Sequence, residues 1–230
     1  MNEIKKELFE NIEEFHSISS KSLDLLLDYG KILKFAKGEH LFLDKEEGSD
    51  LYIVLGGLVT LYKMNAQGDK KVIFILDKGK MINEIVLQGL SASISCEVFE
   101  DAQILCFNKD DFLCVMEQDF ELTKAVLRSL SLKNRRLYRQ LKNTSNSIRG
   151  DKRVAAKLWK LSGDYGLNCE TGTCINIELS ITYLADMLGS TRETVSRQLK
   201  ILTERGLIYM NKGKIIVRNR EELANYFKSS

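Results

Sequence analysis

The chain has 230 residues, 44% of them hydrophobic and 29% charged, and its formal net charge at pH 7 is +2. This composition supports packed cores and excludes a disordered chain, and the length allows two domains. No run of about 18 apolar residues occurs and the N-terminus lacks the apolar segment of a signal peptide, so we expect a cytoplasmic protein without a membrane span. Residues 151–230 carry 13 Lys and Arg against 9 Asp and Glu, a mild basic excess.

Residues 1–30 show apolar side chains at helical spacing. Ile4, Leu8, Ile12 and Phe15 share one face, and Leu23, Leu26 and Leu27 form a second group. In residues 31–109 the helical spacing of apolar side chains gives way to short runs of β-forming residues, with glycines between them. We predict strands at 51–55, 58–62, 72–76 and 102–107, with a hairpin loop at 65–68. Many short strands separated by turns indicate a barrel or a double-sheet roll.

Residues 110–143 predict a short helix followed by a long one. Leu127, Asn134 and Leu141 fall seven residues apart, as do Leu130 and Leu137. This is the a/d seam of a two-stranded coiled coil, in which a polar residue such as Asn134 fixes the register. The seam predicts a homodimer, and the alternative is a helix packed on its own roll. The polar segment 144–150 ends in glycine and suits a hinge.

The C-terminal part begins with a helix that we expect Asp151 to cap, with Val154, Ala155, Leu158, Trp159 and Leu161 inside it. Two strands are predicted around 174–179. After residue 206, strands at 207–210 and 214–218 with a turn at 211–213 predict a β-hairpin wing, and 221–227 a short final helix.

Residues 180–206 predict two helices joined by a tight turn. Gly189 can adopt the positive φ that the turn requires, Thr191 can cap the second helix, and Gly206 ends it. The core-facing positions are Leu184, Ala185 and Leu188 in the first helix and Val195, Leu199 and Leu202 in the second. This arrangement is a helix-turn-helix, whose second helix enters the DNA major groove.

The outward face of the second helix carries Arg192, Glu193, Ser196 and Arg197. Arginine can bind guanine O6 and N7 with two hydrogen bonds, and glutamate can accept from cytosine N4. These residues are therefore candidates for reading bases. The alternative is a solvated helix face with a stray ion pair.

Two stretches resemble one known family. Thr191-Arg-Glu-Thr-Val-Ser-Arg-Gln-Leu199 resembles the recognition helix of the Crp/Fnr family of bacterial transcription regulators. Phe35-Ala-Lys-Gly38, Gly48-Ser-Asp50 and Leu51-Tyr-Ile-Val-Leu-Gly-Gly57 resemble the opening of that family's cyclic-nucleotide-binding roll, where these residues are mostly scaffold. The resemblance implies an α+β chain. Its expected parts are a double-stranded β-helix (jelly-roll) domain for effector sensing over 1–118, a dimerisation helix and hinge over 119–146, and a winged helix-turn-helix DNA-binding domain over 147–230.

The resemblance also implies roles for individual residues. Arg192, Glu193 and Arg197 match base-reading positions. Ser196 resembles the Fnr branch and Arg192 the Crp branch, so TGTGA-like or TTGA-like half-sites are expected in a palindrome. Thr191, Thr194 and wing residue Lys214 are expected to touch phosphates, and Lys200 also belongs to the expected DNA-binding set. The implied partners are double-stranded DNA, RNA polymerase and a second copy of the chain.

The expected effector pocket departs from the cAMP-binding pattern. That pattern has Gly-Glu followed by Arg and Ser, whereas here Asn83-Glu84 precedes a segment, 89–96, without Arg or Lys. A phosphate buried without a cationic partner costs several kcal/mol. We therefore predict that cAMP does not bind, and that another small effector remains possible in a pocket comprising Asn83, Glu84, Ser91 and Ser93. The alternative for Glu84 is a simple turn residue.

The sequence gives little support for a redox, metal-binding or enzymatic function. Cys169 and Cys174 could form a redox switch or half of a metal site, and the alternative is two ordinary hairpin residues. A closed zinc site needs four ligands, and none is predicted. Cys96, Cys106 and Cys114 fit core patterns, and since Cys96 is the first cysteine, the N-terminal cluster of the oxygen-sensing Fnr branch is not expected. No P-loop or hydrolase motif occurs, so we expect no enzyme. The rival function is a ligand-binding module that does not bind DNA.

Overall fold

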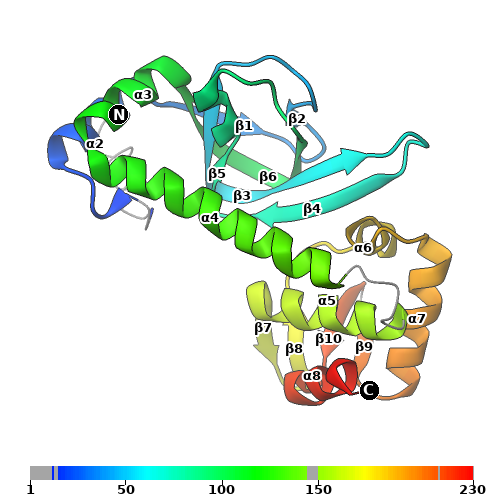
Figure 1. Cartoon of the computed structure of the whole chain (residues 1–230). Coiled ribbons are helices and arrows are strands. Elements are labelled where there is room, and N and C mark those ends of the chain that lie inside the picture. The colour runs from blue at the N-terminus through cyan, green and yellow to red at the C-terminus, as the bar shows by residue number, and fades with distance from the viewer. Residues whose placement is uncertain (1–11, 13–14, 144–149, 212, 230) are drawn as a thin grey trace. The chain divides into compact units, whose positions relative to one another are not determined.

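A computed structural model describes residues 12, 15–143, 150–211 and 213–229 (Figure 1). The predicted positions Ile4 and Leu8, and nearly all of the predicted hinge, lie outside the described residues. The chain divides into two compact units, one comprising Met1–Lys63 with Ile73–Tyr138 and the other Met64–Val72 with Arg139–Ser230. No helix in the described ranges is both long and apolar enough to cross a membrane.

A six-stranded sheet dominates the first unit. Its strands follow the order β1-β6-β3-β4, with β2 paired to β6 and β5 paired to β3. The pairs β1–β6, β2–β6, β3–β5 and β3–β6 are antiparallel, as the roll prediction requires. The strands are β1 (Lys31–Phe35), β2 (His40–Phe42), β3 (Asp50–Met64), β4 (Lys70–Leu76), β5 (Met81–Ile82) and β6 (Ser95–Asn108).

The prediction of two strands separated at Gly56-Gly57 was wrong, because β3 runs without a break through both glycines. The pairing of β3 with β6 shifts register around Gly56 instead. Gly57 has φ 77°, and a Cβ there would lie 2.1 Å from the Asp101 carbonyl oxygen. The glycines therefore allow a bulge and a close strand approach, and the chain does not turn.

Helices cover one end of the roll. Ser19 caps α2 (Ser20–Tyr29), and Asn108 caps α3 (Lys109–Gln118). The predicted short and long helices are confirmed, because α3 ends before Asp119 and α4 (Phe120–Asn143) follows. The Asp119 carboxylate accepts hydrogen bonds from the backbone N–H groups of Ser19 and Glu121, at 2.9 Å and 3.0 Å. This residue thus ties the start of α4 to the start of α2.

The second unit combines helices with a small sheet of order β7-β8-β10-β9. The predicted wing is confirmed as the antiparallel pair β9–β10. Asp151 does not cap the helix as expected, since it lies inside the first turn, where its carboxylate accepts a hydrogen bond from the Tyr226 hydroxyl. The elements are α5 (Gly150–Asp164), β7 (Gly166–Cys169), β8 (Gly172–Ile175), α6 (Ile181–Leu188), α7 (Arg192–Glu204), β9 (Ile208–Asn211), β10 (Lys214–Val217) and α8 (Arg220–Lys228).

Candidate nucleic-acid interface and effector pocket

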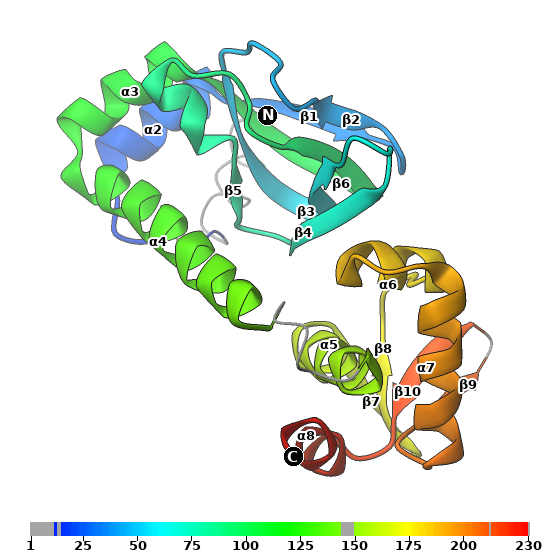
Figure 2. The ribbon, with the colours of Figure 1, turned by 45° about the vertical axis from the view of Figure 1, so that its right-hand side comes forward.

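Helices α6 and α7 form the predicted helix-turn-helix (Figure 2). The Ser180 hydroxyl accepts from the Tyr183 N–H at 3.0 Å and so caps α6. Gly189 has φ 58° and ends that helix in the left-handed conformation. The Thr191 hydroxyl then accepts from the Thr194 N–H at 3.3 Å. The cap and turn residues that the sequence indicated therefore set the angle between the two helices.

Helix α7 has a buried side and an exposed side. Val195, Leu199 and Leu202 are buried, at 0%, 3% and 0% exposure. Since successive residues turn by about 100°, the polar residues on the other side fall within an arc of about 140°. Those exposed residues are Arg192, Glu193, Ser196, Arg197 and Lys200. All of the expected base-reading side chains therefore lie on one face of α7.

Within the described parts of the chain, Arg192, Glu193, Ser196 and Arg197 form no side-chain hydrogen bond or ion pair with other residues. Lys200 approaches Glu204 only to 3.9 Å, with both side chains well exposed. An ion pair of this kind contributes little, because water screens it. The two arginines therefore lie on a solvated face that is accessible to an external partner, and the ion pair on this face is that of Lys200 with Glu204.

Neighbouring side chains brace this unit. The Arg153 guanidinium donates to the Leu188 carbonyl at 2.7 Å, which satisfies the C-terminal end of α6. Arg220 lies over the Trp159 ring at 5.2 Å and donates to the Ser162 hydroxyl at 3.2 Å. These non-covalent contacts link α5 to α6 and to α8, and so they hold the helix-turn-helix in place against α5.

The wing places Lys214 at the start of β10, where it is exposed. Its ammonium donates to the Asn176 side-chain oxygen at 3.0 Å, a neutral partner that leaves the positive charge uncompensated. Arg218, at the far end of the same hairpin, stacks over the Tyr209 ring at 5.7 Å. The wing thus presents an exposed cation in the same unit as α7.

Cys169 and Cys174 lie on adjacent strands but are not opposite one another. Cys169 pairs with Gly172, and Cys174 pairs with Leu167. Diagonal neighbours of this kind lie roughly 7–8 Å apart, whereas a disulfide usually joins Cα atoms roughly 4.4–6.8 Å apart. The Cys169 thiol donates to the Gly172 carbonyl at 3.2 Å. In the described parts of the chain no three His, Cys, Asp or Glu side chains gather as metal ligands.

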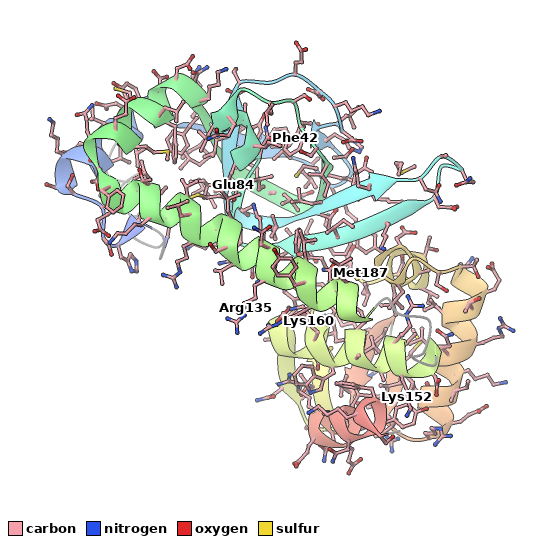
Figure 3. The ribbon with its side chains drawn as sticks, viewed as in Figure 1. Phe42, Glu84, Arg135, Lys152, Lys160 and Met187 are labelled. Atoms are coloured by element: carbon pink, nitrogen blue, oxygen red, sulfur yellow. The ribbon has the colours of Figure 1, made fainter. Side chains whose placement is uncertain are left out.

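Glu84 opens the 3₁₀ helix η2 (Glu84–Gln88) and is 6% exposed. It lies between the roll and α4 (Figure 3). The Lys133 ammonium of α4 donates to both of its carboxylate oxygens, at 2.6 Å and 2.5 Å, and to the Met81 carbonyl at 2.8 Å. The Ser129 hydroxyl donates to the same carboxylate at 2.6 Å. Glu84 is therefore the centre of a buried polar cluster and more than a turn residue.

The other expected pocket residues behave differently. Asn83 adopts φ 67°, a left-handed conformation that asparagine tolerates better than most residues, and its amide donates to the Asp50 carbonyl at 3.0 Å. Ser91 and Ser93 are exposed. Burial lowers the pKa of Lys133, and the charge of Glu84 opposes that shift. Among the four expected residues, Glu84 alone forms an ion pair with α4 in the described structure.

Lys133 is the residue that sequence reasoning missed. It lies 49 positions from Glu84, far outside residues 89–96, where the cAMP-binding pattern has its cation. A signal did exist in the helix: Leu122, Val126, Ser129 and Lys133 repeat at intervals of three and four. Leu122 and Val126 are buried at 0% and 4% exposure. These four positions form the roll-facing stripe of α4.

A different side of α4 carries the predicted seam. Leu127, Leu130, Leu137 and Leu141 remain 55%, 40%, 36% and 67% exposed, and Asn134 is exposed among them. At about 100° per residue, the seam is centred about 90° around the helix from the roll-facing stripe. Helix α4 does pack on its own roll, as the alternative held, but it does so through the other stripe, and the seam side chains remain exposed in the single chain.

Comparison with known sequences supports both the helix-turn-helix and the β-roll. Residues 152–226 match the family model of the Crp-like helix-turn-helix domain, and residues 32–119 match that of the cyclic nucleotide-binding domain. The anaerobic regulatory protein of Bacillus subtilis is 28% identical over 90% of this chain and 87% of its own length. The chain belongs to the Crp/Fnr family. Members of this family are transcription regulators and not enzymes, so the fold and the DNA-binding class follow.

Other Crp/Fnr proteins resemble the chain over most of its length. The cyclic AMP receptor protein of Thermus thermophilus is 27% identical, covering 91% of this chain and 95% of that protein. A CooA variant from Carboxydothermus hydrogenoformans shares the fold, with a TM-score of 0.78, 19% identity, and coverage of 94% and 95% of the two chains. A Crp/Fnr regulator from Thermus thermophilus gives a TM-score of 0.74 at 24% identity, with 86% and 99% covered.

Proposed function

We propose that the chain is a homodimeric regulator that binds a palindromic operator with TGTGA-like or TTGA-like half-sites. Residues 1–118 would sense the signal, 119–146 would dimerise and hinge, and 147–230 would bind DNA. RNA polymerase is the further partner, and the controlling signal is a small effector or redox change other than cAMP. The observation that carries the proposal is the exposed polar face of α7, whose two arginines have no partner among the described residues.

The roles on that face follow from hydrogen-bond geometry. Arg192 and Arg197 would each bind a guanine with two hydrogen bonds, and Glu193 would accept from a cytosine amino group. Ser196 would help distinguish the two half-site types. Thr191, Thr194, Lys200 and Lys214 would contact the backbone, which positions a protein on DNA without reading sequence. Two copies of α7 related by a dimer axis would read half-sites about one helical turn apart.

The proposal is tested by selecting DNA from sheared genomic fragments with the purified full chain. We expect enrichment of a palindrome whose half-sites are separated by about one turn of the duplex. Binding of every fragment alike would rule out the base-reading roles. Failure to retain any DNA at moderate salt would favour the rival function, a module that acts through protein partners.

Cyclic AMP should not bind with micromolar affinity. Residues 89–96 supply no cation for the cyclic phosphate, and the Lys133 ammonium is already bound to both carboxylate oxygens of Glu84. Isothermal titration calorimetry of the full chain with cAMP should show no saturable heat. A micromolar dissociation constant would show that the pocket rearranges to admit the nucleotide.

A further inference from the structure

The charged groups in the contact between Glu84 and α4 have hydrogen-bond partners within the chain. The three N–H donors of the Lys133 ammonium are matched by both Glu84 oxygens and the Met81 carbonyl. The Lys133 and Glu84 side chains are only 15% and 4% exposed. A buried charge is tolerated when it is paired and hydrogen-bonded, and both partners here meet that condition.

This cluster also fixes the rotation of α4. The roll-facing stripe is held by apolar burial at Leu122 and Val126, and one and two turns further on by the bonds of Ser129 and Lys133 to Glu84. Because a helix is rigid over so short a length, anchoring this stripe determines where the seam, about 90° away, points. Without Lys133, α4 would lose the anchor that lies two turns beyond Val126.

We propose that Lys133 occupies, beside Glu84, the place where the sequence predicted an effector, and that it joins the roll to α4 without any small molecule. The inference rests on the proposed function. Its consequence is that the chain dimerises and binds its operator in the absence of an added effector. The controlling signal would then act by breaking the Lys133–Glu84 pair, and the loss of this pair would lower DNA affinity. Lys133 is a positioning residue, since it acts through α4 and touches no DNA.

The first test removes small molecules from the wild-type chain. The protein is unfolded in denaturant, desalted and refolded, and its affinity is measured for the best sequence that the untreated protein selects from a random DNA pool. We expect an unchanged affinity, and no stoichiometric small molecule released in denaturing mass spectrometry. Loss of binding that a heat-treated, low-mass fraction of cell extract restores would overturn the inference while leaving the proposed function intact.

The second test separates positioning from simple stability. Lys133→Met should reduce both operator affinity and dimer affinity at least tenfold, because it leaves Glu84 without its cation. The control is Arg135→Met, a cation of the same helix that is exposed on the side away from the roll (Figure 3), which should bind as the wild type does.

The double variant Glu84→Gln/Lys133→Met decides between the two roles. It removes both charges, so its melting temperature should return toward that of the wild type, whereas its operator affinity should stay low. If melting temperature and operator affinity both recover, the pair is an ordinary structural salt bridge and the inference is wrong. If no form of the chain binds any selected DNA, with or without extract, the proposed function itself fails.

Discussion

Arg197→Ala should abolish the preference for one base pair in each half-site while leaving weak binding to random DNA. Losing a two-bond arginine–guanine contact costs about 1–3 kcal/mol, and a symmetric dimer loses two of them. Arg197 is suited to this effect because it is exposed on α7 and has no partner among the described residues whose loss would disturb the fold. Competition binding with operators that differ at single positions measures the effect directly.

Lys214→Ala is the contrasting variant. Its ammonium contacts only the neutral Asn176 amide oxygen in the described structure, so its proposed partner is a phosphate. Its loss should weaken operator and random DNA alike and flatten the salt dependence of binding, by about one unit of slope for each chain of the dimer. If Arg197→Ala and Lys214→Ala weaken the two DNAs in the same ratio, the division into base-reading and phosphate-contacting residues is wrong.

Leu130→Lys should convert the protein into a monomer at micromolar concentration. Burying a leucine side chain at an interface contributes about 1.5–3 kcal/mol, and the substitution removes that gain from both chains and adds two charges to an apolar seam. Leu130 is 40% exposed in the single chain, so the change should leave the fold of the protomer intact. Sedimentation velocity across a range of concentrations would report the change.

Leu132→Lys provides the matched control. Leu132 is 45% exposed, much like Leu130, but two residues along the helix it lies on the opposite side from the seam. The same chemical change there should leave the dimer unaffected. Dissociation by both variants would mean that lysine on α4 destabilises the helix itself, and a dimeric Leu130→Lys protein would place the interface elsewhere.

The helix-turn-helix could be predicted from the sequence because its determinants are local. Thr191 caps α7 three residues before the amide that it binds, and Gly189 adopts the positive φ that its position implied. Val195, Leu199 and Leu202 are buried as their spacing indicated. Each feature depends on neighbours within one or two helical turns, so composition and period were enough to find it.

The roll was harder to predict because its strands are defined by distant partners. The sequence pattern predicts a strand end at Gly57, yet the close approach of Gly57 to Asp101, 44 positions away, makes it part of a bulge. Lys133 was overlooked for the same reason, since its partner Glu84 lies in another element. Helical period placed Lys133 beside Ser129, but only the folded chain shows which surface that side of the helix meets.

The buried lysine also suggests how the protein could be made to respond to an added compound. In Lys133→Ala, a space the length of a short alkyl chain would open beneath α4, ending at the Glu84 carboxylate and the Met81 carbonyl that now receive the ammonium. A propylammonium ion has the charge and length of the missing atoms. A chain that binds its operator without an added effector, as proposed above, would become one that is induced by a simple primary amine.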